Sequence, residues 1–183
     1  MHYRTFFPKV NLRCRYIDYL LTSEPHVYSN KFEGRTNTRK YIGVVFTINN
    51  YNYFIPLSSP KDKDYEIIGE EKRIRKDTYL IFRIKSVSKG KAELKGTIQF
   101  SKMIPVPNRE LIEYNVDAET DINYKNLVLT EIQYIRKNSE KIVKRAQLIY
   151  NKRYISDEQI YNKCLDFKHL EALHDEWLDF VSD

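Results

Sequence analysis

The chain contains two apolar stretches, residues 41–48 and 53–57, on either side of a pair of asparagines. Both stretches are rich in β-branched and aromatic residues, and Asn49-Asn50 tolerates the positive φ angles of a tight turn, so the pattern predicts a β-hairpin. Because side chains alternate along a strand, one face of the first strand is expected to carry Ile42, Val44, Phe46 and Ile48. Pro56 has no amide hydrogen to donate to a sheet, so the second strand is predicted to fray there or to lie at an edge.

The rest of the first half alternates between short ordered segments and polar ones. The apolar spacing predicts strands within 1–12, a short helix over 15–21, and strands over 79–84 and 92–100. Between them lie a long polar loop over 22–38 and a segment over 61–77 that is dense in both charge signs and is expected to be exposed.

The second half of the chain is predicted to be helical. Apolar residues from 124 to about 150 recur with a helical period, which predicts one long helix. Ser156-Asp157-Glu158-Gln159 has the form of a capping box and predicts another helix start, and a last apolar stripe runs over 170–180. Strands followed by helices predict an α+β fold: a compact, highly twisted, mostly antiparallel β-sheet with helices packed on it and a helical C-terminal part.

The length and the net charge of the chain limit the classes of protein to which it can belong. The 183 residues fit a single domain over 1–183. A net charge of +6 with a pI near 9.1 favours an acidic partner, of which nucleic acid is the commonest. A basic protein that is merely soluble would have the same charge.

Other features of the sequence argue against a metal site, a cofactor and a membrane partner. Cys14 and Cys164 have no metal-ligand spacing, so neither a metal site nor a cofactor is expected. His169 and His174 lie five positions apart, which does not suit two ligands on one helix face, and are interpreted as surface residues. No apolar run approaches the roughly 20 residues of a membrane span, and the N-terminus has no signal-peptide pattern, so the protein is expected in the cytoplasm without a membrane partner.

Polar groups that suit phosphate chemistry follow the predicted hairpin. Ser58-Ser59-Pro60-Lys61 supplies two hydroxyls and a cation where the chain leaves the sheet. The sequence has no glycine-rich phosphate loop and no G-x-S-x-G elbow. Hydroxyls and cations on a basic protein suit cleavage of RNA, in which the 2′-OH attacks the adjacent phosphate and cations stabilise charge on its oxygens. For Ser58, a turn-forming role before Pro60 is the alternative.

Four segments of the chain occur in the order YIGVV (41–45), YFIPLSSPK (53–61), MIPV (103–106) and QYIRKNSEKI (133–142). Together they resemble the ToxN-like endoribonuclease toxins of type III toxin–antitoxin systems, which act in abortive infection, over nearly the whole chain. The resemblance implies a sheet related to the Kid/MazF toxin barrel and metal-independent RNA cleavage that leaves 2′,3′-cyclic phosphate and 5′-OH ends. It also implies cellular or phage RNA as substrate, and inhibition by a small RNA antitoxin from a tandem-repeat array, which the toxin trims and holds in a ring-shaped assembly.

By position within these motifs, the resemblance implies the catalytic groups. Ser58 and Ser59 match the family's hydroxyl pair, and Lys61 matches its nearby lysine. The family's cation before the Y-I-G strand falls on Arg39, or on Lys40 if the register shifts by one. No histidine lies near these residues in the sequence, so the general base is not assigned.

A second group of residues is predicted to contact RNA. The family's loop tyrosine falls on Arg35 here, with Tyr28 the nearest upstream tyrosine, and the remaining candidates are Arg136, Lys137, Asn138 and Lys141. A solvated helix face is the alternative for the basic residues of this last group. At the level of the whole protein, the alternatives to the RNA-cleaving toxin are a non-catalytic basic RNA-binding module and a protein-interaction domain whose charge is incidental.

Overall fold

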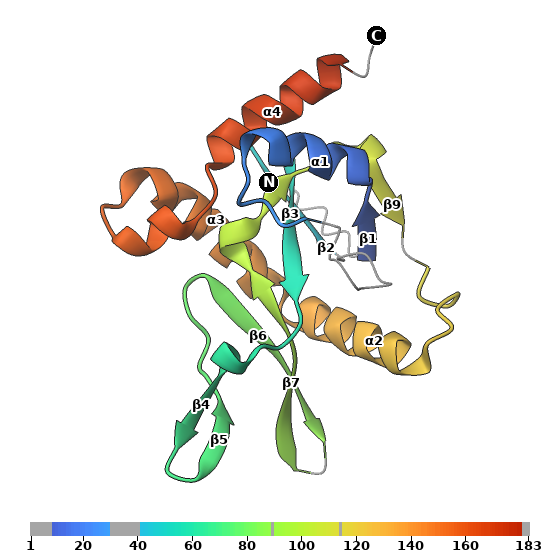
Figure 1. Cartoon of the computed structure of the whole chain (residues 1–183), viewed down its shortest axis with the longest axis vertical. Helices are drawn as coiled ribbons and strands as arrows, with labels where there is room; N and C mark the ends of the chain where they lie inside the picture. The colour runs from blue at the N-terminus through green and yellow to red at the C-terminus, as the bar shows by residue number, and fades with distance from the viewer. Residues whose placement is uncertain (1–8, 30–40, 89, 114, 181–183) are drawn as a thin grey trace.

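Residues 9–29, 41–88, 90–113 and 115–180 are described by the computed structural model of the chain, shown in Figure 1. The strands are β1 (Lys9–Leu12), β2 (Tyr41–Ile48), β3 (Tyr51–Ser58), β4 (Tyr65–Ile68), β5 (Glu71–Ile74), β6 (Ile81–Ser88), β7 (Lys91–Gln99), β8 (Ile104–Pro105) and β9 (Leu111–Glu113). The α-helices are α1 (Cys14–Ser23), α2 (Ile122–Lys137), α3 (Ser139–Ile155) and α4 (Phe167–Phe180). Short 3-10 turns are η1 (Asp62–Asp64), η2 (Phe100–Lys102), η3 (Asn108–Glu110) and η4 (Gln159–Lys163).

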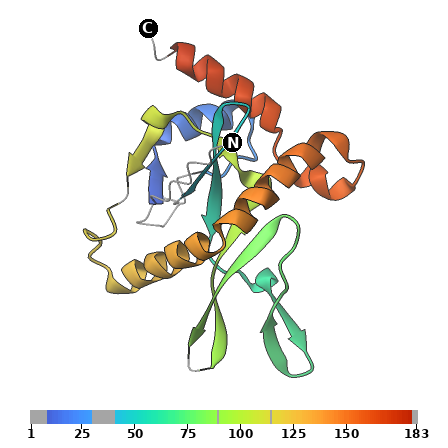
Figure 2. The same ribbon diagram turned by 180° about the vertical axis from the view of Figure 1, so that it is seen from behind.

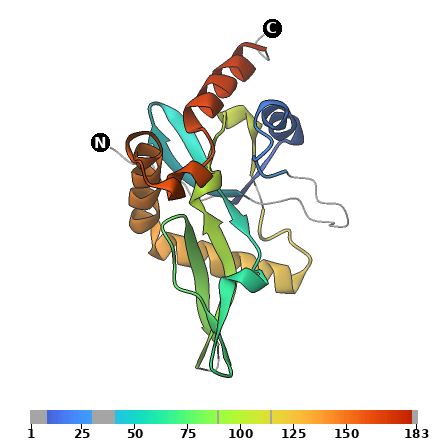
Figure 3. The ribbon, with the colours of Figure 1, turned by 60° about the vertical axis from the view of Figure 1, so that its left-hand side comes forward.

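The strands form a curled antiparallel half-barrel. Within the described residues the sheet order is β6-β7-β3-β2-β1-β9, with β8 also paired to β3, while β4 and β5 form a separate hairpin. Helix α2 packs on β6 and β7, α3 contacts β2, and α1 lies beside α4 (Figures 2 and 3). The predicted α+β fold with a twisted antiparallel sheet and a helical C-terminal part is confirmed. None of the helices built from the described residues is long and apolar enough to cross a membrane.

The predicted hairpin is formed by β2 and β3, and Asn49 and Asn50 make its turn. Their φ angles are 50° and 71°, and Ile48 pairs with Tyr51 directly before and after them. Two consecutive residues at positive φ produce the turn whose twist matches that of the flanking strands. The local sequence therefore predicted this element correctly.

Strand β3 is central in the sheet, which corrects the prediction for Pro56. On one side β3 pairs with β2; on the other it pairs with β8 at residues 53–54 and with β7 at residues 57–58. The Val106 amide donates to the Asn52 carbonyl, so even-numbered residues of β3 direct their backbone groups to this second side. Pro56 faces the gap between β8 and β7, where its missing amide costs no ladder bond.

The long helix predicted from residue 124 is two helices, because the chain changes direction at Asn138. This residue has φ −111° and ψ 13°, and its side-chain amide donates to the Tyr134 carbonyl over 2.8 Å, which closes α2. The predicted helix start at Ser156 is also wrong: the chain forms only the 3-10 turn η4 there. Helix α4 begins after Asp166, whose carboxylate accepts the His169 amide.

The mixed-charge segment over 61–77 contains a β-hairpin that the sequence did not predict. Strands β4 and β5 pair around Gly69, which has a φ of 64°, and the hairpin projects beside the outer ends of β6 and β7 (Figure 2). Most of its side chains are exposed, as predicted, but Asp64 at its base is buried.

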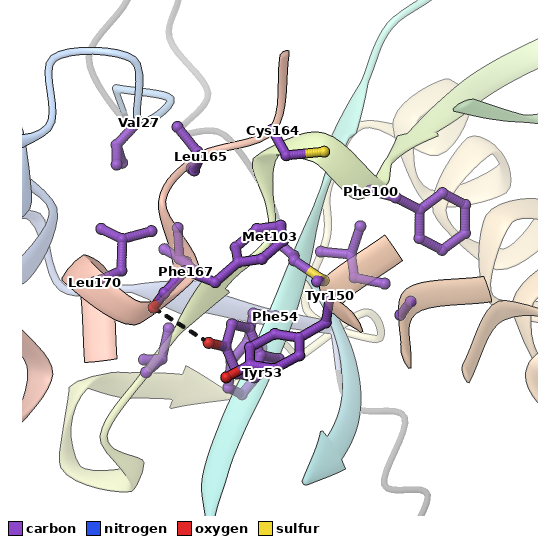
Figure 4. Packing of buried hydrophobic residues seen from close by; sticks show 14 of the residues in the cluster. Val27, Tyr53, Phe54, Phe100, Met103, Tyr150, Cys164, Leu165, Phe167 and Leu170 are labelled. Atoms are coloured by element: carbon purple, nitrogen blue, oxygen red, sulfur yellow. Dashed lines mark hydrogen bonds between the residues drawn. The ribbon is translucent and has the colours of Figure 1, made fainter. Parts of the chain in front are cut away.

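The core lies between β3 and the helices, around Tyr53 (Figure 4). Tyr53 is fully buried and packs edge-on against Tyr150 and Phe167. His174 was expected on the surface but is 9% exposed, since its ring packs edge-on against Tyr51. Cys164 is a buried free thiol, and burial raises its pKa to about 11.

Candidate active site

The C-terminal end of β3 carries Ser58, which is held by the neighbouring strand. Ser58 pairs with Thr97 of β7, and the Thr97 hydroxyl donates to the Ser58 carbonyl over 3.3 Å. Thr97 in turn accepts a 2.7 Å bond from the side-chain amide of Gln99. Thr97 and Gln99 are buried, so this polar chain fixes the backbone at the point where the chain leaves the sheet.

The predicted residues Ser58, Ser59 and Lys61 lie together in the turn that follows. Ser58 is half-buried and its hydroxyl donates to the Ser59 carbonyl over 3.4 Å, whereas Ser59 and Lys61 are exposed. Two hydroxyls and one cation are thus presented within four residues at the end of a rigid strand. An exposed site of this kind is open to a polymer substrate.

The backbone of Lys61 is anchored by a buried carboxylate that the sequence reasoning missed. The Lys61 amide donates to Asp64 Oδ2 over 3.0 Å, and the Asp64 amide donates to the Lys61 carbonyl over 2.9 Å. Arg83 Nη2 of β6 donates to the other carboxylate oxygen, Asp64 Oδ1, also over 3.0 Å. The side chains of Asp64 and Arg83 are only 3% and 4% exposed. Neither residue had a sequence signal as part of the site: Asp64 is one of several acids in the mixed-charge segment over 61–77, and Arg83 is one cation in the strand predicted over 79–84.

A row of polar residues crosses the sheet beneath this turn. Arg83 pairs with Thr97, and Thr97 pairs with Ser58, so the three side chains lie on one face of the sheet. The turn over 59–64 therefore begins at one end of the row, at Ser58, and is attached by Asp64 to the other end, at Arg83.

Helix α2 brings a second buried carboxylate to the opposite face of the same strands. Glu131 is 7% exposed, and an ideal Cβ on Gly96 would lie 2.9 Å from its Oε1 and 3.4 Å from the Ser58 carbonyl oxygen. A side chain at position 96 would therefore require the Glu131 carboxylate to move. The sequence did not single out Glu131, because an acidic residue within a predicted helix is ordinarily interpreted as exposed to solvent.

Three predicted cations, Arg35, Arg39 and Lys40, fall outside the described residues. Tyr28, the last of the loop candidates, is half-buried.

The remaining candidates lie at the junction of α2 and α3. Arg136, Lys137 and Lys141 are exposed, as both an RNA contact and a solvated helix face require. Asn138 is half-buried and uses its side chain to close α2. The structure gives it a helix-capping role, which does not depend on RNA.

Among the described residues, no cluster of three or more His, Cys, Asp or Glu side chains is placed to hold a metal ion. The groups presented at the β3 end are hydroxyls and an ammonium.

Comparisons with known proteins identify relatives over most of the chain. Residues 9–175 match the family model described as toxin ToxN of the type III toxin–antitoxin system. Endoribonuclease AbiQ of Lactococcus lactis subsp. lactis is 32% identical over 175 residues, which cover 92% of this chain and 92% of AbiQ.

Solved structures share the fold. One is a toxin of a bacterial type III toxin–antitoxin system that a non-coding RNA pseudoknot inhibits selectively; it has a TM-score of 0.76 and 25% identity, covering 93% of this chain and 97% of that one. Another is AbiQ, a lactococcal anti-phage endoribonuclease, with a TM-score of 0.75 and 25% identity, covering 94% and 98%.

Proposed function

Because the chain belongs to the ToxN toxin family of type III toxin–antitoxin systems, we propose that it is an anti-phage endoribonuclease whose active site is the turn after β3. One observation carries the proposal: exposed Ser59 and Lys61 stand next to half-buried Ser58 on a strand end that buried polar bonds fix in place. The site is thus prepared to position a phosphodiester and to place positive charge beside it.

The proposed reaction is an internal transesterification of RNA. The 2′ oxygen attacks the adjacent phosphorus, its proton goes to a base, and the bond from phosphorus to the 5′ oxygen breaks as that oxygen gains a proton. The products are a 2′,3′-cyclic phosphate and a 5′-OH, and no metal takes part. Lys61 stabilises charge on the non-bridging oxygens, while the hydroxyls of Ser58 and Ser59 orient the phosphate and relay a proton. Arg39 or Lys40 adds a second cation.

The proposed partner is a small RNA antitoxin. A solved relative is inhibited by a non-coding RNA pseudoknot, and this chain has the positive charge that an RNA ligand requires. We expect the antitoxin to come from a tandem-repeat array that the enzyme trims, and to close a ring-shaped assembly with it. Its contacts would come from Arg35, Tyr28, Arg136, Lys137, Asn138 and Lys141. Free enzyme would cleave cellular or phage RNA in the cytoplasm.

The test uses purified full-length protein and single-stranded RNA in the presence of EDTA. Cleavage that leaves cyclic-phosphate and 5′-OH ends, and that Ser59→Ala abolishes while RNA affinity and folding are kept, supports the proposal. Ser156→Ala, which changes a serine in the loop after α3, is the matched control and should cleave normally. Salt-dependent RNA binding without cleavage would instead favour the non-catalytic RNA-binding module.

A further inference from the structure

The position of Lys61 depends on a buried ion pair outside the motif that predicts the site. Two hydrogen bonds join Lys61 and Asp64: the Lys61 amide donates to the side-chain oxygen Asp64 Oδ2, and the Asp64 amide donates to the Lys61 carbonyl. They close the turn η1, so the backbone at Lys61 cannot move without breaking a bond to Asp64. The lysine side chain is long and exposed, and its reach is therefore set by where this backbone is held.

Arg83 fixes Asp64 in turn. Its Nη2 binds Asp64 Oδ1, its Nη1 donates to the Lys76 carbonyl over 2.6 Å, and its backbone amide donates to Asp77 Oδ1 over 2.9 Å. Because a buried charge without its partner is strongly unfavourable, Asp64 and Arg83 hold each other in place. The pair thus joins the turn after β3 to β6 and to the segment before β6.

The same arginine is in register with the serine at the other end of the site. Arg83 pairs with Thr97, and Thr97 pairs with Ser58 and donates to its carbonyl. The backbone at Lys61 is therefore held relative to Ser58 in two ways, by the intervening turn and by this row across the sheet.

We propose that Asp64 and Arg83 are positioning residues for the RNA cleavage reaction, acting through Lys61. This inference rests on the proposed function. The buried pair orients the Lys61 backbone so that its ammonium meets the phosphate that the Ser59 hydroxyl orients. Neither residue touches RNA, because both side chains are almost fully buried. A displacement of about 1 Å at a reacting group can lower a rate about 100-fold, so loss of the pair affects turnover even where the fold survives.

The decisive variant is Asp64→Asn, measured in single-turnover cleavage at saturating protein. The amide keeps one acceptor oxygen, so either the Lys61 amide or Arg83 Nη2 loses its partner. The rate constant is expected to fall about 10- to 100-fold, with an unchanged dissociation constant for RNA. In a Lys61→Ala background, Asp64→Asn should cause little further loss, because two residues that act as a unit are non-additive. If Asp64 contributed only to general stability, the fold-losses in rate constant caused by the two substitutions would instead multiply.

Glu71→Gln is the matched control, since it removes an exposed carboxylate that pairs with Arg73 in the adjacent hairpin. It should cleave at the wild-type rate. If the Asp64→Asn variant does not fold, Arg83→Lys is measured in the same double-mutant cycle with Lys61→Ala. Lysine keeps the positive charge but cannot reproduce the contacts that the guanidinium group makes with two of its nitrogens.

Two results separate the inference from the proposed function. If wild-type protein cleaves RNA while the Asp64 or Arg83 variant cleaves equally well, or shows losses that multiply with Lys61→Ala, the positioning role is wrong and the proposed function stands. If the wild-type protein binds RNA without cleaving it, the proposed function and the positioning role both fail.

Discussion

Tyr53 of β3 donates a 2.6 Å hydrogen bond to Glu171 of α4, which joins two residues 118 positions apart in the sequence. Tyr150 of α3 donates to both oxygens of the same carboxylate, over 3.0 and 3.2 Å, and accepts a bond from the Asn49 side chain over 3.0 Å. Glu171 is 8% exposed, so its carboxylate oxygens need these donors as hydrogen-bond partners. The hairpin turn and two helices are thereby connected at the end of β3 opposite Ser58.

Removal of the Tyr53 hydroxyl should destabilise the fold without changing the chemistry. Tyr53→Phe keeps the ring in the core but takes one donor from the buried Glu171 carboxylate, which costs about 1–3 kcal/mol of unfolding free energy. Urea denaturation gives this value. Tyr79→Phe, at a tyrosine that is 55% exposed, is the control and should stay within about 0.5 kcal/mol of wild type. Equal stability of Tyr53→Phe and wild type would contradict the role of this bond.

Stability should fall at alkaline pH because of the same cluster. Burial, followed by the hydrogen bond to Glu171, raises the pKa of Tyr150 to about 12. The folded state thus favours the protonated phenol, and this stabilisation is fully present below the unfolded pKa of about 10 and is lost as pH rises towards 12. Urea denaturation across this range should show a shallower decline for Tyr150→Phe than for wild type. Parallel declines would contradict this assignment.

The turn at Asn49-Asn50 should respond to substitutions according to its backbone angles. Asn50 has a φ of 71°, which glycine adopts freely and a β-branched residue does not. Asn50→Gly should leave stability equal or slightly higher, while Asn50→Val should lower the unfolding free energy by about 1–2 kcal/mol. Thermal and urea denaturation of both variants test this, and a Val variant as stable as the Gly variant would refute the turn geometry.

A methyl group at Gly96 should disturb Glu131. The added carbon would lie 2.9 Å from Glu131 Oε1, so the carboxylate must move within a buried site. Gly96→Ala should therefore lower the unfolding free energy by about 1–3 kcal/mol. In a Glu131→Ala background the same substitution should cost less, with a coupling of about 0.5–3 kcal/mol in a double-mutant cycle. Additive losses would indicate that the backbone near Ser58, and not Glu131, sets the requirement for glycine.

The local sequence pattern was sufficient to predict those strands and helices whose structure depends mainly on their own residues. The hairpin of β2 and β3 follows from its two apolar stretches and from two asparagines that accept positive φ. The helix predicted over 15–21 is present as α1, and the two predicted strands after residue 78 are present as β6 and β7. The helix break at Asn138 was missed, because the apolar period continues across it, whereas in the structure Asn138 has non-helical backbone angles and its side chain closes α2.

The sequence by itself determined the β-hairpin, the order of strands and helices, and the hydroxyls and cation of the turn after β3, since each depends on residues that are close along the chain. Tertiary structure alone decided that β3 is central, that Pro56 fits a gap between two partner strands, and that Asp64, Arg83 and Glu131 are buried beside the site. The physical reason is that burial and pairing of a charged group depend on the elements that fold over it. On the sequence, Asp64 is one of several acids in a charged segment; in the fold, an arginine 19 positions away makes it the support of Lys61.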